Sequence, residues 1–325
     1  MAQSIRFSRH GGSDVLELID QPAREPGPLE VRVRNHAIGL NFIDTYYRSG
    51  LYPPPSLPSG LGSEGAGEVE AVGSAVKHLQ VGDRVAYATG PLGAYGELHV
   101  LPAQHLVKLP ESISFEQAAA LMLKGLTVQY LLRQTYHVEA GQTILWHAAA
   151  GGVGLIACQW AKALGAKLIG TVSSPEKAAL AKANGAWATI DYSREDVVQR
   201  VLELTDGAKC PVVYDSVGKD TWERSLDCVA HRGLLVSFGN ASGAVSGVNL
   251  GILAQKGSLY VTRPNLAGYA NSPENLQNMA DELFAMVASG AIQVEIGQRY
   301  PLSEAAAAQD ALSSRKTTGS TILLP

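Results

Sequence analysis

The chain has 325 residues, about twice the length of a typical single domain, which favours two domains. Apolar residues make up 46% and charged residues 17%, a balance that excludes collagen-like, disordered and coiled-coil classes. The formal charge of −4 and the pI near 6.1 provide no basic excess for binding a run of phosphates, so no nucleic-acid partner is expected.

The N-terminus and the cysteines indicate a cytoplasmic protein. Residues 1–7 contain no apolar signal segment, and the cysteines are too few and too widely spaced for a disulfide framework. Residues 140–161 lack charge over a length that could cross a bilayer. This stretch contains His147 and a glycine cluster, so a strand, a turn and a helix explain it better, and no membrane partner is expected.

The N-terminal third of the chain predicts short strands separated by turns. Alternating residues at 31–34 and 67–73, and a segment at 82–87 that begins with a turn, are typical of strands. The prolines of residues 52–58 exclude a helix or a central strand, so an extended surface loop is expected there. This part therefore predicts a compact, mostly β domain.

From Ser114 onward the pattern changes to alternating strands and helices. Residues 115–133 have an uninterrupted helical period, and Ser114 with Gln117 forms a capping-box signature. Strands are then expected at 143–147, 167–172, 189–190, 212–215 and 234–238, with helices at 153–164, 175–184, 196–204 and 221–228. Strands separated by helices predict an α/β fold with a doubly wound parallel sheet.

The tail after Pro264 predicts a helix at 273–289 and a strand at 320–324. It is too short to form a domain and is expected to pack back on the first one. The expected boundaries are therefore 1–124, completed by 265–325, for the first domain and 125–264 for the second.

Residues 144–155 have the strand, glycine turn and helix of a phosphate-binding fingerprint. Gly151 and Gly152 let the backbone approach a pyrophosphate, and Gly154 lets the helix lie close to the strand. Ala149 stands where the first glycine is usual, and the alternative is a tight turn without a ligand. Within a strand–helix–strand unit, the segment predicts a dinucleotide site.

The end of the second parallel strand favours NADPH over NADH. A free ribose 2′-hydroxyl is usually held by an acidic residue about 20 positions after the turn. Ser173 occupies that position, and hydroxyls together with the cation of Lys177 suit a 2′-phosphate, which a carboxylate would repel. Glu176 is the residue that opposes this assignment, and the alternative for Lys177 is a solvated helix lysine.

Motifs along the whole chain carry a family resemblance. They lie at 41–46, 48–50, 62–67, 124–127, 150–154, 214–218 and 237–240. Together they resemble the medium-chain dehydrogenase/reductase superfamily, and most closely its quinone oxidoreductase branch, the zeta-crystallin-like NADPH:quinone reductases. The resemblance implies a Rossmann domain for NADPH and a mostly β, GroES-like catalytic domain.

The resemblance also bears on metal and on oligomeric state. Zinc dehydrogenases of the superfamily have a cysteine where Asn41 stands, a histidine where Ser63 stands and a four-cysteine lobe. This sequence has no cysteine before Cys158 and no ligand-like histidine spacing, so no metal is expected. Residues 257–262 are expected to form an edge strand, which must be covered or paired. Superfamily relatives pair such edges across a two-fold axis, which implies a homodimer.

Without a Lewis acid, the chemistry favours an acceptor that is already electron-poor. Quinones and α,β-unsaturated carbonyls fit, because hydrogen-bond donors can stabilise the oxyanion that develops on them. The expected catalytic residues are Asn41 as an amide donor, with Tyr46 and Tyr52 as phenol donors that line an apolar slot. Asn41 and Tyr46 rest on the family motif and Tyr52 on the adjoining loop, and the alternative for either tyrosine is core packing.

The resemblance assigns further residues to the cofactor. Expected cofactor-binding residues are Asn41, Tyr46, Thr127, Gly151, Gly152, Val153, Ser173, Lys177, Tyr192, Ser216, Val217, Phe238, Gly239, Arg263 and Arg315. Thr127 is assigned to the nicotinamide end, and Arg315 to the 2′-phosphate with a solvated arginine as the alternative. Lys124 could lie near the cofactor or at the surface.

The leading interpretation is a zinc-free, NADPH-dependent quinone reductase. An enzyme that reduces the C=C bond of enones or alkenals would differ only in pocket shape, which residues 53–58 and 88–94 must set. A third interpretation is a non-enzymatic RNA-binding or crystallin-like protein that retains the cofactor site, as relatives in this branch do. The acidic pI and the absence of a Lys/Arg cluster oppose that interpretation.

Overall fold

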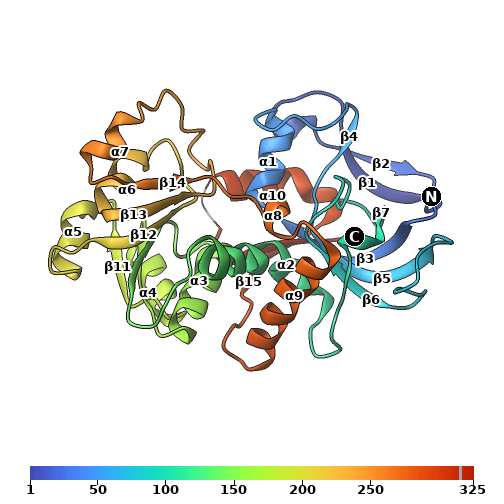
Figure 1. The fold of residues 1–325 in the computed structure, drawn as a ribbon. Helices are drawn as coiled ribbons and strands as arrows, with labels where there is room; N and C mark the ends of the chain where they lie inside the picture. The colour runs from blue at the N-terminus through green and yellow to red at the C-terminus, as the bar shows by residue number, and fades with distance from the viewer. Residues whose placement is uncertain (315–316) are drawn as a thin grey trace. The chain divides into compact units, whose positions relative to one another are not determined.

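The computed structural model describes residues 1–314 and 317–325 (Figure 1). Contacts divide the chain into two compact units. Unit 1 comprises Met1–Leu126, Ala270–Ala288 and Val294–Pro325, and unit 2 comprises Thr127–Tyr269 and Ser289–Gln293. Each unit has its own sheets and its own cluster of buried apolar side chains.

Unit 1 is built on two sheets within its described residues. In the smaller sheet, β1 (Ala2–Phe7) pairs antiparallel with β2 (Glu17–Gln21) and β4 (Ser59–Gly60). The larger sheet has the order β15-β16-β3-β5-β6-β8, and β7 also pairs with β3. Its strands are β3 (Glu30–Leu40), β5 (Gly65–Val72), β6 (Arg84–Tyr87), β7 (Leu98–Pro102), β8 (Val107–Lys108), β15 (Ile296–Pro301) and β16 (Ser320–Leu324).

Strand β3 shows why the sequence alternates at 31–34. Val31 and Val33 are fully buried in the core of unit 1, whereas Arg32 and Arg34 both donate to the carboxylate of Glu70. Successive side chains of a strand point to opposite faces, so alternation produces one apolar and one charged face. The C-terminal strand β16 pairs antiparallel with β3 and completes this sheet.

The helices of unit 1 are α1 (Phe42–Ser49), α2 (Phe115–Tyr130, which continues into unit 2), α9 (Pro273–Ala288) and α10 (Ala305–Ser313), with 3₁₀ turns at Ser13–Val15, Ala103–His105 and Leu302–Glu304. Two of these helices, α1 and α2, begin with a capping box. The predicted capping box is confirmed, because Gln117 N donates to Ser114 Oγ at 3.2 Å and Ser114 N donates to Gln117 Oε1 at 2.9 Å. Helix α1, in a region expected to be mostly β, was missed. The helix is short, and a local hydrogen bond caps its start, in which Asn41 N donates to Asp44 Oδ2 at 2.9 Å.

Unit 2 contains a parallel sheet in the order β11-β10-β9-β12-β13-β14 within its described residues (Figure 1). The strands are β9 (Thr143–Trp146), β10 (Lys167–Val172), β11 (Ala188–Asp191), β12 (Cys210–Asp215), β13 (Val229–Ser237) and β14 (Tyr260–Thr262). The helices are α3 (Gly152–Ala163), α4 (Pro175–Ala183), α5 (Val197–Leu204), α6 (Trp222–Cys228), α7 (Gly251–Gln255) and α8 (Leu266–Tyr269). This strand order is that of a doubly wound dinucleotide-binding sheet, so the predicted fold class is confirmed.

Three predicted boundaries in unit 2 differ from the structure by three residues or more. The helix expected to reach Arg133 ends at Tyr130, and Leu131–Thr135 form a π-helical turn. The hydroxyl of buried Tyr214 donates to the carbonyl of Leu131 at 3.0 Å, a tertiary contact that periodicity cannot reveal.

The other two differences concern strands. Strand β13 begins at Val229, earlier than the predicted start at residue 234. Strand β14 begins at Tyr260, later than the predicted residue 257, because Gly257 and Ser258 have positive φ values of 116° and 56°. A strand needs negative φ values, so residues with positive φ cannot continue it.

Residues 140–161 form strand β9, the glycine turn and helix α3, as predicted. Among the described residues, no helix has the length and the apolar character needed to cross a membrane.

Candidate functional site

The glycine turn after β9 has the geometry of a phosphate-binding turn. Ala148 has a φ of 57°, in the left-handed region, and Gly151 is the N-cap of α3. A Cβ at Gly151 would meet only the Ala148 carbonyl at 3.4 Å, so this position is open. A Cβ at Gly154 would lie 2.5 Å from the Ala148 oxygen, so only glycine lets α3 approach the turn this closely. The N-terminus of α3 thus provides backbone N–H groups and partial positive charge.

Most of the predicted cofactor residues follow the carboxyl ends of the six parallel strands. They are Gly151, Gly152 and Val153 after β9, Ser173 after β10, Tyr192 after β11, Ser216 and Val217 after β12, Phe238 and Gly239 after β13, and Arg263 after β14. Carboxyl ends of parallel strands meet at one edge of a sheet, which is where doubly wound proteins bind nucleotides.

The residues predicted for the 2′-phosphate, apart from Arg315, follow the ends of β10 and β11. Tyr192 N donates to the Val172 carbonyl at 3.1 Å, so Tyr192 follows the strand next to the one that Ser173 follows. Ser174 caps α4 by accepting from Lys177 N at 3.3 Å, which fixes the backbone of Lys177 in the first turn. Glu176 is exposed in that turn, and its hydrogen bond with Ser174 lowers its pKa.

A buried network of four side chains ties three strand ends together. The Ser225 hydroxyl donates to Asp215 Oδ2 at 2.7 Å, and His147 Nε2 lies 3.0 Å from the same hydroxyl. His147 Nδ1 lies 3.0 Å from Thr171 Oγ1. Burial lowers the pKa of His147, and a neutral ring that donates to Ser225 and accepts from Thr171 satisfies every member. His147 is therefore a core residue, and it lies at the ends of β9, β10 and β12.

Asp215 shapes the turn that carries Ser216 and Val217. Its Oδ1 accepts from Val217 N at 2.8 Å and from Gly218 N at 3.0 Å, and the Thr221 hydroxyl donates to both carboxylate oxygens. Asp215 belongs to the motif at 214–218, but a sequence pattern does not show which backbone N–H groups a carboxylate will bind.

The turn after β13 is packed closely against the turn after β12. Phe238 N donates to the Asp215 carbonyl at 2.8 Å, and the Phe238 ring lies 5.3 Å from that of buried Trp146. A Cβ at Gly239 would lie 2.2 Å from the Ser216 oxygen, so glycine is required there. The Arg263 guanidinium donates to the carbonyls of Ser237 and Gly239, at 2.8 and 3.0 Å, which gives this predicted cofactor residue a structural role as well.

The other predicted cofactor residues do not follow these strand ends, and two of them, Asn41 and Tyr46, belong to unit 1. Thr127 is half-buried in α2, at the first position of unit 2. Arg315 lies outside the described residues.

Unit 1 contains a second cluster around the buried carboxylate of Glu64, which lies just before β5. Asn41 Nδ2 donates to Glu64 Oε2 at 2.6 Å, and Lys124 Nζ lies 3.3 Å from the same oxygen. Leu123 N donates to the other oxygen at 2.6 Å. Lys124 is 6% exposed, so it is not at the surface, which was one of the two positions open to it from the sequence.

Sequence reasoning therefore gave Glu64 no role and left the position of Lys124 open. The available signal was an acidic residue between small residues at 62–67, directly before the strand expected at 67–73. Their pairing depends on α2 lying against the residue that precedes β5, an arrangement that has no local sequence signature.

Tyr46, in helix α1, and Tyr52, in the loop that follows α1, form an aromatic pair. Both are half-buried, and their rings lie 5.3 Å apart at an interplanar angle of 72°. Tyr52 N donates to the Tyr46 carbonyl at 3.0 Å, which holds the loop after α1 against the helix. The tyrosines predicted to line an apolar slot are thus adjacent.

Asp44 is a fully buried carboxyl in the first turn of α1. Its Oδ2 accepts from Asn41 N and from the Tyr95 hydroxyl, each at 2.9 Å, while its Oδ1 has no hydrogen-bond partner among the described residues. Burial raises the pKa of Asp44 to about 7; the two hydrogen bonds and Lys124 oppose this shift, and Glu64 adds to it.

Asp44→Asn is expected to remove a pH dependence from the stability of the fold. The folded-state pKa of about 7 is above the ordinary value of 3.8, so the folded protein holds this proton more tightly than the unfolded chain. The resulting stabilisation is complete at acidic pH and is lost as pH rises through the folded pKa, by at most about 1.4 kcal/mol per pH unit. Urea unfolding of wild type and variant across mildly acidic to mildly alkaline pH measures the difference in slope. Asp20→Asn, at an exposed position of β2, is the matched control and should keep the wild-type slope. A wild-type stability that does not fall over this range would contradict the prediction.

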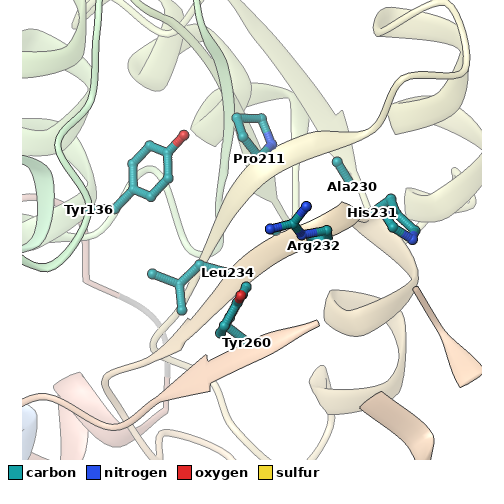
Figure 2. Close-up of a pocket in the computed structure, with 8 residues that line it drawn as sticks. Tyr136, Pro211, Ala230, His231, Arg232, Leu234 and Tyr260 are labelled. Carbon is teal, nitrogen blue, oxygen red and sulfur yellow. The ribbon is translucent and has the colours of Figure 1, made fainter. Parts of the chain in front are cut away.

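A pocket of about 440 Å³ lies at the edge of unit 2 (Figure 2). Its lining includes Tyr136, Arg232, Leu234 and Tyr260, and Tyr260 lies opposite Leu234 in the β13–β14 pairing. Pro211 in its lining is near the amino end of β12, so the pocket is not at the carboxyl edge where the cofactor residues lie. Strand β14 ends the sheet, and its Tyr260 and Val261 are 57% and 38% exposed.

The parallel strand order and the glycine turn define the chain as an α/β dinucleotide-binding protein. Family models for the alcohol dehydrogenase GroES-like domain and for zinc-binding dehydrogenases match residues 27–111 and 152–284. Quinone oxidoreductase of Pseudomonas aeruginosa is 74% identical over 325 residues, which is 100% of both chains.

Two further relatives cover nearly the same length. The crystal structure of Escherichia coli quinone oxidoreductase complexed with NADPH has a TM-score of 0.99 and 60% identity over 100% of both chains. The 2-haloacrylate reductase of a Burkholderia species is 42% identical and covers 100% of this chain and 99% of its own. The chain belongs to the quinone oxidoreductase branch of the medium-chain dehydrogenase/reductase superfamily, as its motifs predicted.

Proposed function

We propose that this protein catalyses the NADPH-dependent reduction of quinones. The observation that carries the proposal is full-length identity of 74% to a quinone oxidoreductase. The near-identical fold of an NADPH-complexed quinone oxidoreductase supports the cofactor.

Unit 2 is the proposed NADPH-binding domain. The open position at Gly151 and the N-terminus of α3 suit a pyrophosphate, which needs close backbone approach and N–H donors. Ser173, Tyr192 and the Lys177 ammonium suit a 2′-phosphate at the ends of β10 and β11. When bound, NADPH would supply the hydride for the reaction. Thr127, Ser216, Val217, Phe238, Gly239 and Arg263 are proposed to line the rest of the site, and Arg315 to reach the 2′-phosphate.

Unit 1 is the proposed catalytic domain, with Asn41, Tyr46 and Tyr52 facing the quinone and Asn41 and Tyr46 also contacting the cofactor. The two tyrosine rings offer an apolar surface with phenol donors, which suits a flat, electron-poor acceptor. Hydrogen-bond donors of this kind stabilise the negative charge that develops on the acceptor oxygen.

The residues at the position of the family's catalytic metal do not fit zinc. The Asn41 amide uses its nitrogen to donate to Glu64, and a lysine ammonium lies against the same carboxylate. An ammonium repels a divalent cation, and an amide nitrogen is not a zinc ligand. The described residues also contain no group of three or more His, Cys, Asp or Glu side chains that could hold a metal ion. We therefore propose a zinc-free reaction.

The first experiment is NADPH oxidation with 1,4-benzoquinone, followed by absorbance, with and without a chelator and with NADH for comparison. Chelator-insensitive turnover with NADPH well above NADH is expected. A parallel assay with an alkenal tests the second candidate, reduction of a conjugated C=C bond, which the 42% identity to 2-haloacrylate reductase favours. Turnover of the alkenal alone would replace quinone reduction by that activity. Tight NADPH binding without turnover of either acceptor would favour a non-enzymatic role.

Lys177→Ala tests the assignment of the 2′-phosphate. Loss of one charged hydrogen bond is worth about 1.5–3 kcal/mol, so NADPH affinity should fall by about 10- to 100-fold while NADH affinity changes little. A lysine at a helix N-terminus opposes the helix dipole, so its removal should not destabilise α4. Fluorescence titration with both cofactors measures the effect, and Lys182→Ala, an exposed position of the same helix, is the control. Equal losses for both cofactors would show that Lys177 acts structurally.

A homodimer formed through the edge strand β14 is part of the proposal. An edge strand with two exposed apolar side chains must be covered or paired, and the adjacent pocket offers a further surface for a second copy (Figure 2). Light scattering should give twice the mass of one chain for the wild type, and Tyr260→Asp should lower this mass. A wild-type mass equal to that of one chain would contradict the proposed homodimer. The cysteines, buried and unpaired among the described residues, support a cytoplasmic location.

A further inference from the structure

We propose that Lys124 is a further catalytic residue, whose ammonium donates a proton to the oxygen of the reduced quinone, and that Glu64 positions it. This inference rests on the proposed function and names a residue that the family motifs left without a role.

The cluster around Glu64 is fixed from three segments of unit 1. Asn41 joins β3 to α1, Glu64 precedes β5, and Leu123 and Lys124 belong to α2. One carboxylate oxygen binds Leu123 N, and the other binds both Asn41 Nδ2 and Lys124 Nζ. The three contacts leave the carboxylate little freedom to move.

Gly39 shows how closely the backbone surrounds this carboxylate. A Cβ at Gly39 would lie 2.0 Å from Glu64 Oε2 and 2.4 Å from the Ala119 carbonyl oxygen. Any side chain at this position would displace Glu64, so the chain is built to hold the carboxylate between β3 and α2. The pair Glu64 and Lys124 is correspondingly buried, at 0% and 6% exposure.

Stability alone does not account for such a pair. Taking an ammonium and a carboxylate out of water costs about as much as their attraction returns, and apolar replacements are often equally stable. A buried ion pair at a candidate active site is more readily explained by chemistry that needs a positioned charge.

Glu64 holds two hydrogen-bond donors, the Asn41 amide and the Lys124 ammonium, on one carboxylate oxygen. An amide nitrogen has two N–H groups and an ammonium has three, so each retains donors after binding Glu64. Asn41 is already proposed to face the acceptor, and Lys124 shares its oxygen partner. An acceptor oxygen that reaches Asn41 therefore lies beside the ammonium.

The proton and electron balance is complete. When NADPH is bound, the hydride would leave a C–H bond of the dihydronicotinamide and form a bond to one quinone oxygen, and the electron pair displaced through the ring would leave negative charge on the opposite oxygen. An O–H bond forms to this oxygen as an N–H bond of Lys124 breaks, and the neutral amine regains a proton from water. Positioned acids of this kind contribute about 10²- to 10⁴-fold to a rate.

The test compares two acceptors in the same variant. Chlorine substituents make a hydroquinone more acidic, so its anion needs less help from a proton donor. Lys124→Met should lower kcat by at least about 100-fold with 1,4-benzoquinone and by less than about 10-fold with 2,6-dichloro-1,4-benzoquinone, after subtraction of the uncatalysed rate. Because the fraction of folded enzyme cancels in this ratio, partial misfolding does not obscure the result.

Further variants separate catalysis from structure. Lys124→Met combined with Glu64→Gln removes both buried charges and should show the same selective loss. Lys77→Met, at an exposed position of unit 1, should leave both rates unchanged. An equal loss on both quinones would show a structural role and overturn the proposal, as would no loss.

A binding measurement tests Lys124 without turnover. The anion 4-nitrophenolate is a stand-in for the reduced quinone oxygen, and Lys124→Met should weaken its binding at least about 10-fold while NADPH affinity is kept. Unchanged phenolate binding would overturn the proposal. A wild-type protein inactive on both quinones would refute the proposed function instead, and phenolate binding would then decide the role of Lys124 by itself.

Discussion

Gly154→Ala is expected to destabilise unit 2 and to abolish tight NADPH binding. The new Cβ would lie 2.5 Å from the Ala148 oxygen and 2.6 Å from the Ala149 carbonyl group, and both are backbone atoms that cannot rotate away. Helix α3 would have to move off the turn, at a cost of about 1–3 kcal/mol or more. The same movement would carry its N-terminus away from the pyrophosphate, so NADPH affinity should fall by more than about 100-fold.

Gly151→Ala is the matched comparison within the same turn. Its Cβ would meet the Ala148 oxygen at 3.4 Å, an ordinary contact, and its φ of −79° suits alanine. The fold should therefore keep its wild-type melting temperature, while NADPH binding weakens because the methyl group blocks the close approach of the phosphate. Thermal unfolding and cofactor titration of both variants separate the two roles. Wild-type NADPH affinity in Gly151→Ala would show that the pyrophosphate does not contact this residue.

Asp215→Ala is expected to cost at least about 3 kcal/mol of folding stability, because each buried donor left without an acceptor costs about 1–3 kcal/mol. The donors affected are the backbone N–H groups of Val217 and Gly218 and the hydroxyls of Thr221 and Ser225. The loss should extend to NADPH affinity, since the same carboxylate shapes the turn at Ser216 and Val217. Urea unfolding and cofactor titration are the measurements.

Asp220→Ala provides the control for Asp215, because Asp220 is exposed on the same loop. Within residues 1–314 and 317–325, its side chain makes no hydrogen bond, and its backbone N–H donates to Ser242 Oγ. Wild-type behaviour is expected for it. If Asp215→Ala unfolded at the wild-type urea concentration, the network through Ser225 and His147 would not hold the strand ends together.

Much of unit 2 was determined by local sequence. Strand β10 was predicted at its observed bounds of Lys167–Val172, and helix α4 to within one residue, because proline and serine at its start cap a helix wherever it lies. The parallel order followed from strands alternating with helices, since a crossover connection allows little else. The glycine turn was recognisable because close backbone approach has a fixed residue requirement.

The boundaries that failed depend on tertiary contacts. The π-helical turn at Leu131–Thr135 accompanies a hydrogen bond from Tyr214, which is distant in sequence. Helix α1 is too short for periodicity to reveal, although its N-cap Asn41 and the acidic Asp44 were in view. Boundaries of this kind depend on contacts with residues far away in the sequence, which a local pattern cannot identify.

The difference between what the sequence determines and what the tertiary structure determines is clearest in the candidate site. The sequence by itself determined the class of chemistry, since the residue types at the glycine turn, after β10 and at Asn41 constrain the cofactor and argue against a metal. Only the tertiary structure decided that Asn41, Glu64 and Lys124 form one buried cluster, and that Asp215 joins His147 through Ser225. A carboxylate finds its partners through packing between segments far apart in the chain, and no spacing of residues encodes that packing.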